Sequence, residues 1–137
     1  MKKISLSAFT LLLLFNLSSC KNEDVFSIND SSSNIPVIAN AANAFSFTVA
    51  ANRYNYSETH NLQMNADTLS VAITISGEVN GNGNILIKDG TGAAIYQKDL
   101  GSSMISAEVL KLVTIPKTLN LSFSNFTGKI IIAVAGK

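Results

Sequence analysis

His60 is the only histidine in the chain and the first residue to consider for catalysis. Glu58 lies two positions before it, and on a strand the two side chains share a face, so that the carboxylate could orient the imidazole. A serine hydrolase also needs a nucleophile and an oxyanion hole, and the chain has no Gly-x-Ser-x-Gly elbow. A small hydrolase around His60 and Glu58 therefore stays a minor alternative, and we expect a protein that is not an enzyme.

The metal-ligating and charged residues point the same way. One Cys and one His cannot build a Cys- or His-rich metal centre, and the acidic residues are scattered rather than paired, so we expect no metal and no cofactor. The segment Asp89-Gly90-Thr91 could offer a partial calcium site, but a hairpin turn explains it better. A formal charge of +1 leaves no basic face for nucleic acid.

A polar and aromatic cluster is the best candidate for contact with a ligand. Tyr54 and Tyr56 lie beside Asn52 and Asn55 in the sequence and would share one face of a strand, with Arg53 and His60 nearby. Aromatic rings beside hydrogen-bonding groups are typical of glycan sites, although the chain has no Trp. The alternative is a pair of half-buried tyrosines that pack on the sheet. The candidate contact face is Arg53, Tyr54, Tyr56 and His60.

The first twenty residues have the layout of a secretory leader. Lys2 and Lys3 precede an apolar stretch that ends near Leu17, which is shorter than the roughly 20 residues of a membrane-spanning helix. The sequence Leu17-Ser18-Ser19-Cys20 resembles the lipobox of bacterial lipoproteins. The resemblance implies that residues 1–19 are a signal peptide and that Cys20, the only cysteine, carries the lipid that anchors the mature protein in the membrane.

The residues after Cys20 predict where the protein goes. Lys21 stands where an Asp would resemble a retention signal for the inner membrane, so we expect the outer membrane of a Gram-negative bacterium. The segment Lys21-Asn22-Glu23-Asp24 resembles the export tag of some surface lipoproteins and favours exposure at the cell surface over the periplasm. Removal of the leader leaves eight basic and nine acidic residues, which provides no positive patch for anionic lipid.

Residues 20–43 are rich in Asn, Ser and Asp and predict a flexible tether, with an ordered edge strand at Ile35–Ala39 as the alternative. Residues 44–137 show a period of two with Gly- and Asn-rich turns near every tenth residue, which predicts a single antiparallel β-sandwich of about eight strands, jelly-roll or immunoglobulin-like. The expected strands are 45–51, 54–64 (less certain), 69–75, 85–88, 94–98, 109–115, 119–123 and 129–135.

The hairpin expected around Asp89-Gly90-Thr91-Gly92 resembles one found in galactose-binding-like and related jelly-roll sandwiches, which supports the fold class and not a ligand. We expect a lipid-anchored surface protein with a non-catalytic role in binding, adhesion or assembly. The alternative is a glycan-binding accessory protein of a surface polysaccharide-uptake system. The expected partners are the membrane, through the lipid on Cys20, and a glycan or a surface protein.

Overall fold

The computed structural model describes residues 33–137, and they form an all-β domain. The predicted signal peptide, the lipid attachment at Cys20 and most of the predicted tether lie outside the described residues. No helix of residues 33–137 is long and apolar enough to cross a membrane. The strands are β1 (Val37–Ala41), β2 (Ala44–Asn61), β3 (Thr68–Asp89), β4 (Ala94–Asp99), β5 (Met104–Lys111) and β6 (Pro116–Gly136).

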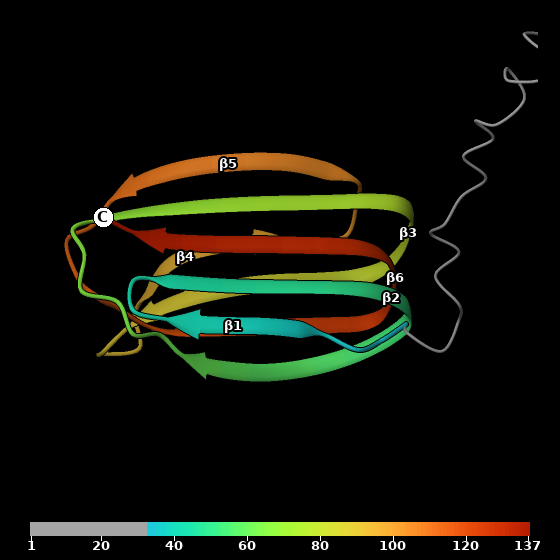
Figure 1. Cartoon of the computed structure of the whole chain (residues 1–137), viewed down its shortest axis with the longest axis horizontal. Helices are drawn as coiled ribbons and strands as arrows, with labels where there is room; N and C mark the ends of the chain where they lie inside the picture. Colours follow the sequence, from blue (N-terminus) through green and yellow to red (C-terminus); the bar gives the residue numbers. More distant parts are fainter. Residues whose placement is uncertain (1–32) are drawn as a thin grey trace, which may run out of the picture.

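Three strands are long enough to run through both layers of the sandwich. The strand order is β1-β2-β6-β3-β4, β5 also pairs with β3, and every pairing is antiparallel. The register of β2, β6 and β3 shifts near the middle of each strand, where the sheet folds over on itself. One layer, which we call layer one, contains β1, β5 and the 44–51, 68–76 and 128–136 halves of the long strands (Figure 1). Layer two contains β4 and the other halves.

The bends use backbone conformations that most residues avoid. Arg53 in β2 and Asn125 in β6 have positive φ angles of 49° and 48°, and Gly81 in β3 has a φ of 84°. A Cβ added at Gly81 would lie 2.3 Å from the carbonyl oxygen of Asn125, so the two bends touch where only a glycine fits. The three strands therefore turn together at one end of the sandwich.

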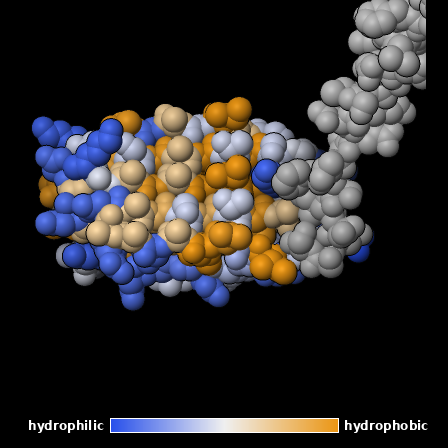
Figure 2. All heavy atoms as spheres, in the orientation of Figure 1, coloured by the Kyte–Doolittle hydropathy of each residue, from blue (hydrophilic) through white to orange (hydrophobic). Residues whose placement is uncertain are grey.

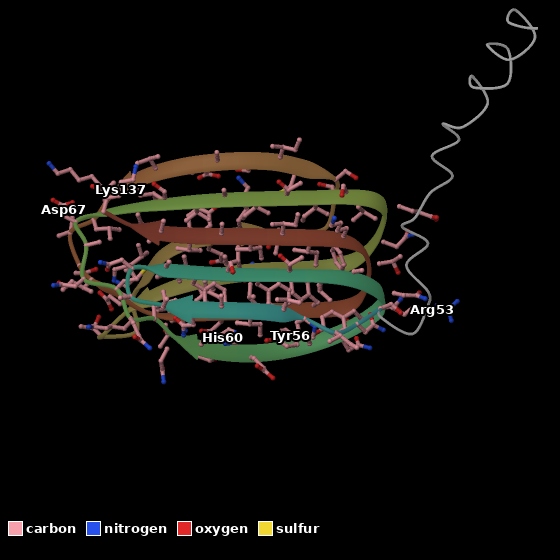
Figure 3. All side chains as sticks on the ribbon, viewed as in Figure 1. Arg53, Tyr56, His60, Asp67 and Lys137 are labelled. Carbon is pink, nitrogen blue, oxygen red and sulfur yellow. The ribbon has the colours of Figure 1, made fainter. Side chains whose placement is uncertain are left out.

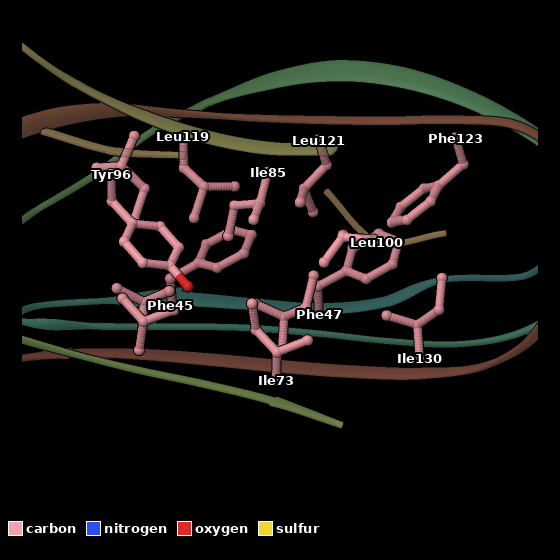
Figure 4. Close-up of a cluster of buried hydrophobic side chains, with 14 of the residues drawn as sticks. Phe45, Phe47, Ile73, Ile85, Tyr96, Leu100, Leu119, Leu121, Phe123 and Ile130 are labelled. Carbon is pink, nitrogen blue, oxygen red and sulfur yellow. The ribbon is translucent and has the colours of Figure 1, made fainter. Parts of the chain in front are cut away.

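The core lies between the two layers and is filled by alternate residues of each strand. Phe47 of layer one stacks on Phe123 of layer two with ring centroids 5.7 Å apart, and neither ring is more than 4% exposed (Figure 4). Because successive side chains of a strand point to opposite faces, each straight half buries one side and exposes the other. The largest fully buried side chains are Phe45, Phe47, Phe126, Leu69, Ile73, Ile75, Ile85, Ile87, Leu100, Leu119, Leu121 and Ile130.

The fold class predicted from the sequence is confirmed, and the number of strands differs for a simple reason. Three of the observed strands each join two expected ones. The strand β2 joins 45–51 and 54–64, β3 joins 69–75 and 85–88, and β6 joins 119–123 and 129–135. The segments 77–83 and 125–128, predicted as turns, lie inside β3 and β6 as bends. Gly and Asn adopt positive φ equally well in a hairpin turn and in a bulge, so composition alone does not distinguish the two.

Two boundaries also differ from the prediction. Residues 37–41, assigned to the tether with an edge strand as the alternative, form β1 and pair with β2, so the sandwich begins before Ala44. The strand expected at 109–115 is β5 at Met104–Lys111, because its residues pair with Thr68–Ile75 of β3 and the chain then leaves the sheet. The apolar residues at 112–115 look like a strand in the sequence but lie in the connection to β6.

Candidate ligand-contact surface

Tyr56, Glu58 and His60 lie on one side of β2, as their spacing predicts. This half of β2 is the edge strand of layer two, and the three side chains point into the open edge of the sandwich. The Tyr56 hydroxyl donates to Glu58 Oε2 at 3.0 Å and also lies 3.0 Å from His60 Nε2. A phenol has one proton, so His60 Nε2 is the donor in the second hydrogen bond. In this tautomer Nε2 is not a free base for a substrate.

The sequence placed Tyr54 on the same face as Tyr56, and the structure brings the two rings together, stacked with centroids 5.5 Å apart. Tyr54 is only 8% exposed, and its ring also stacks on Phe123. Burial, with a smaller contribution from the Glu58 charge, raises the pKa of Tyr54 above its usual value. Burial is also the main cause of the raised pKa of Tyr56, which the hydrogen bond to Glu58 increases further. Both hydroxyls therefore stay neutral.

Arg53 is separated from this cluster by the bend of β2. Its backbone N–H donates to Thr127 Oγ1 at 3.2 Å, and its side chain is exposed at the bent end of the sandwich (Figure 3). His60 lies toward the other end of the strand, 5.1 Å from the ring of Phe45. The structure therefore brings Tyr54, Tyr56 and His60 together along the edge of layer two and places Arg53 apart from them.

A cleft of about 520 Å³ lies on layer two beside these residues. It lies over the row in which Ser57, Ser122, Asn84 and Asp99 are register partners on neighbouring strands. Since this row faces away from the core, the cleft is open to solvent, and its hydroxyl, amide and carboxylate groups share the wall with Tyr56 and Phe123. Its lining residues are Tyr56, Ser57, Asn82, Gly83, Asn84, Asp99, Gly101, Ser122, Phe123 and Ser124.

Most polar groups of the cleft are free to bind a ligand. Asn84 Nδ2 donates to Asp99 Oδ1 at 2.9 Å and to the Lys98 carbonyl oxygen at 3.3 Å, which fixes the amide and leaves its Oδ1 available as an acceptor. Within residues 33–137, no side-chain hydrogen bond occupies Ser57, Ser122 or Asn82. Unoccupied hydroxyl and amide groups suit a neutral, polyhydroxylated ligand. The hydroxyl groups of such a ligand can both donate and accept hydrogen bonds, so they can take the place of the water that solvates the cleft.

Asn82, Asn84 and Ser122 were not among the site residues predicted from the sequence. Asn82 belongs to the segment 77–83, which was predicted as a turn, and Asn84 lies between that segment and the strand expected at 85–88. Ser122 was predicted only as the outward residue between Leu121 and Phe123. The available signal was the density of Asn and Ser at outward positions of neighbouring strands, but reading it requires the strand pairing.

The opposite edge of the sandwich is closed by a second polar network, between β4 and β5. Lys98 forms an ion pair with Glu108 and donates to Ser106 Oγ at 2.9 Å, while the Tyr96 hydroxyl donates to Glu108 Oε1 at 3.3 Å. The hydrogen bonds from Lys98 and Ser106 hold the pKa of Glu108 below its usual value. Burial, together with the Glu108 charge, raises the pKa of Tyr96 to about 12. This network joins the two layers, since β4 belongs to layer two and β5 to layer one.

Asp89 ends β3 and forms a structural turn. Its Oδ1 accepts hydrogen bonds from the Thr91 backbone N–H at 2.8 Å, the Thr91 hydroxyl at 2.7 Å and the Ala93 N–H at 3.0 Å. These donors lower the pKa of Asp89 and explain how a carboxylate tolerates burial. Residues 33–137 contain no group of three or more His, Cys, Asp or Glu side chains that could hold a metal ion. The hairpin interpretation of this segment is confirmed by the pairing of β3 with β4.

Comparisons with known proteins add structural neighbours. No family model matches the chain, and no curated protein does. A Bacillus endospore appendage protein of disulfide-linked pili is 10% identical, with a TM-score of 0.41 over 76% of this chain and 93% of the other. The CBM1 of BiXyn10A in its apo form is 12% identical, with a TM-score of 0.40 over 77% and 94%. A CBM4 structure is 7% identical, with a TM-score of 0.37 over 74% and 78%.

Proposed function

We propose that the protein is a lipid-anchored, non-catalytic binding protein of a Gram-negative outer membrane, facing the outside of the cell. The leader and Cys20 support the anchor, because the single cysteine stands at the position that the lipobox requires. The polar cleft supports the binding role, because it combines a volume of about 520 Å³ with unoccupied hydrogen-bonding groups. In this proposal the sandwich presents the cleft to a ligand while the lipid holds the protein at the membrane.

The chemistry of the cleft favours a carbohydrate as the ligand over a charged molecule. Asp99 is the only charged residue in its wall, so a strongly anionic or cationic ligand would gain little there. Hydroxyl and amide groups on three neighbouring strands match the alternating donors and acceptors of a sugar chain. The protein would then serve as an accessory that captures a surface polysaccharide for uptake, and a protein partner in adhesion or assembly is the competing candidate.

A glycan array probed with the full chain in mild detergent tests this ligand class. We expect binding to at least one neutral glycan, and a drop of tenfold or more for Asn84→Ala, because each lost hydrogen bond to a ligand costs about 1.4 kcal/mol. Asn61→Ala is the matched control, since Asn61 is an exposed asparagine of β2 outside the cleft. Equal binding by both variants, or no glycan binding by the wild type, would exclude the cleft as a carbohydrate site and favour a protein partner.

Metabolic labelling with a palmitate analogue tests the anchor separately. The wild-type chain should be labelled and should fractionate with the outer membrane, whereas Cys20→Ala should be unlabelled because the acceptor thiol is gone. Label that persists in Cys20→Ala would contradict the assignment of Cys20. Protease treatment of intact cells then distinguishes surface exposure, in which the domain is digested, from a periplasmic orientation, in which it is protected.

A further inference from the structure

The outward face of layer one carries three rows of residues without a charge. The outward residues of β1, β2, β6, β3 and β5 are register partners, so each row crosses all five strands. Figure 2 shows these rows as mainly apolar stripes, interrupted by paler residues, across the front of the molecule, with hydrophilic residues at the left end and along the lower edge. We call this the apolar face. Its rows are Val37-Thr48-Ile131-Thr74-Ile105, Ala39-Ser46-Ala133-Ala72-Ala107 and Ala41-Ala44-Ala135-Ser70-Val109.

The apolar face leaves large side chains in solvent. Ile105 is 88% exposed, Val109 73% and Val37 68%. Charged residues begin just beyond the rows. Lys111 of β5, the register partner of Thr68, lies beyond the row of Val109. Lys129 of β6, the register partner of Ala50 and Ser76, lies beyond the row of Ile131. Exposed apolar residues are often scattered singly, whereas here they are gathered in one continuous uncharged area, and an area of this kind often has a function.

We propose that the apolar face is the interface of a homodimer. A second copy is the occupant that the face itself specifies, because its two outer rows are complementary to each other in size over β1, β2 and β6, although both rows carry a large residue at β5. The row that contains Ile131 is bulky, whereas the row that contains Ala135 is small over β1, β2 and β6. A hollow of about 240 Å³ lies over this small corner, lined mainly by alanines. A large side chain from a second copy would fill it.

A twofold axis along the central row brings these rows into register. Rotation about this axis places the row of Ile131 of one copy over the row of Ala135 of the other, and the strands of the two copies run antiparallel. Ile131 then enters the hollow beside Ala44 and Ala135 of the second copy, and the reverse contact follows by symmetry. Ala133, on the middle strand of the central row, lies on the axis and faces its own counterpart. Sheets pack face to face in this manner through interdigitated side chains.

The size of the face predicts a weak and reversible dimer. The face is roughly 24 Å wide across its five strands, which lie about 4.8 Å apart. It is roughly 20 Å long across its three rows, which lie about 6.8 Å apart, when the margins of the side chains are included. The area is therefore about 500 Å² per copy. The pair would bury about 1,000 Å², which is near the lower limit for a specific interface. Association should therefore depend on protein concentration.

Sedimentation of the full chain in mild detergent, from about 10 μM to about 1 mM, tests this interface. We expect the wild type to shift from monomer to dimer over this range and Ala133→Arg to stay monomeric, because two guanidinium groups would meet on the axis. Asn120→Arg, a half-buried outward position of layer two, is the matched control and should dimerise as the wild type does. Urea unfolding of both variants shows whether they are folded.

A mixture of variants tests the axis itself. Ala133→Asp alone should also stay monomeric, but an equal mixture of Ala133→Arg and Ala133→Asp should associate, because opposite charges then face each other across the axis. A wild type that is monomeric at every concentration, or a mixture that fails to associate when the wild type dimerises, would overturn the proposal. If the wild type is monomeric and Ala133→Arg loses binding to phosphatidylcholine vesicles, the apolar face contacts lipid instead.

Discussion

The two outer faces of the sandwich are built from the same three strands and have opposite chemistry. On layer one, the outward residues of β2, β6 and β3 within the three rows are Ala, Ser, Thr and Ile, and Lys129 lies just beyond the row of Ile131. On layer two, the outward residues of the same strands include Ser57, Asn84 and Ser122, and they wall a cleft. The face of layer one is uncharged and would suit the proposed contact with a second copy. The face of layer two carries hydrogen-bonding groups and would suit the proposed polar ligand.

The bend makes this division possible. A strand alternates between inward and outward residues, and the inward residues of β6 and most of those of β3 are apolar in both halves. In β2 the inward side is apolar in layer one, whereas Glu58 and His60 share it with Tyr56 at the edge of layer two. The outward residues become more polar as each strand passes from layer one to layer two. A single long strand can therefore carry two unrelated surfaces while contributing to one core.

The largest effect should come from Phe47→Ala, which removes a ring shared by the two layers. Phe47 is fully buried and contacts both Tyr56 and Phe123 across the core. We expect the free energy of unfolding to fall by about 3–5 kcal/mol, measured by urea titration. Val109→Ala, on the apolar face, is the control and should change it by less than about 0.5 kcal/mol. Similar losses for both variants would show that the two layers do not share one core.

The bend itself is tested by two glycines of β3. A Cβ at Gly81 would collide with the backbone of β6, whereas a Cβ at Gly77, which has a similar φ of 89°, meets nothing within 4 Å. Gly81→Ala should therefore cost about 3 kcal/mol and Gly77→Ala about 1 kcal/mol, measured in the same titration. Gly81 is next to Asn82, so ligand binding at the cleft should weaken while the apolar face keeps its behaviour. Equal costs for the two glycines would contradict the close contact between the bends.

Tyr56→Phe has a smaller expected effect and asks whether the edge beside the cleft is structural or contacts ligand. The variant keeps the stacked ring but leaves Glu58 and His60 without their shared hydroxyl, so unfolding should become easier by about 1 kcal/mol. Glycan binding that falls further than stability explains would support direct contact by Tyr56. Unchanged binding would restrict Tyr56 to closing the edge of the sandwich.

The smallest effect should appear at the opposite edge, where Glu108 holds Lys98 and Ser106. The folded-state pKa of Glu108 is lowered, so its contribution to stability is present above the unfolded value near 4.5 and is lost as the pH falls through the folded pKa. Wild-type urea midpoints should therefore decline on acidification to about pH 3, and Glu108→Gln should decline less. Asp89 remains in the variant and also has a lowered pKa, so part of the decline should persist. Identical declines would show that the Lys98 contact adds nothing.

Much of the fold could be predicted because it depends on local alternation. Phe45, Phe47 and Val49, and likewise Leu69, Val71, Ile73 and Ile75, are buried as their period of two predicts. The continuity of β3 through Gly77–Gly83 could not be predicted, since a bulge and a turn use the same residues. Tyr54 and Tyr56 show the same limit at the site. Their shared face followed from spacing, but the burial of Tyr54 depends on Phe123, which is far away in the sequence.

The sequence by itself determined which side of each strand faces the core, because alternation along a strand is a local property of the chain. The proposed anchor likewise rests on the sequence alone, because the resemblance to a lipobox lies in residues 17–20 and does not depend on the fold. The tertiary structure alone decided that Ala72, Ala107 and Ala133 share one row while Asn84 and Ser122 share another. Such rows join strands that are distant in sequence, and the hydrogen-bond register that aligns them is set by packing across the whole sandwich.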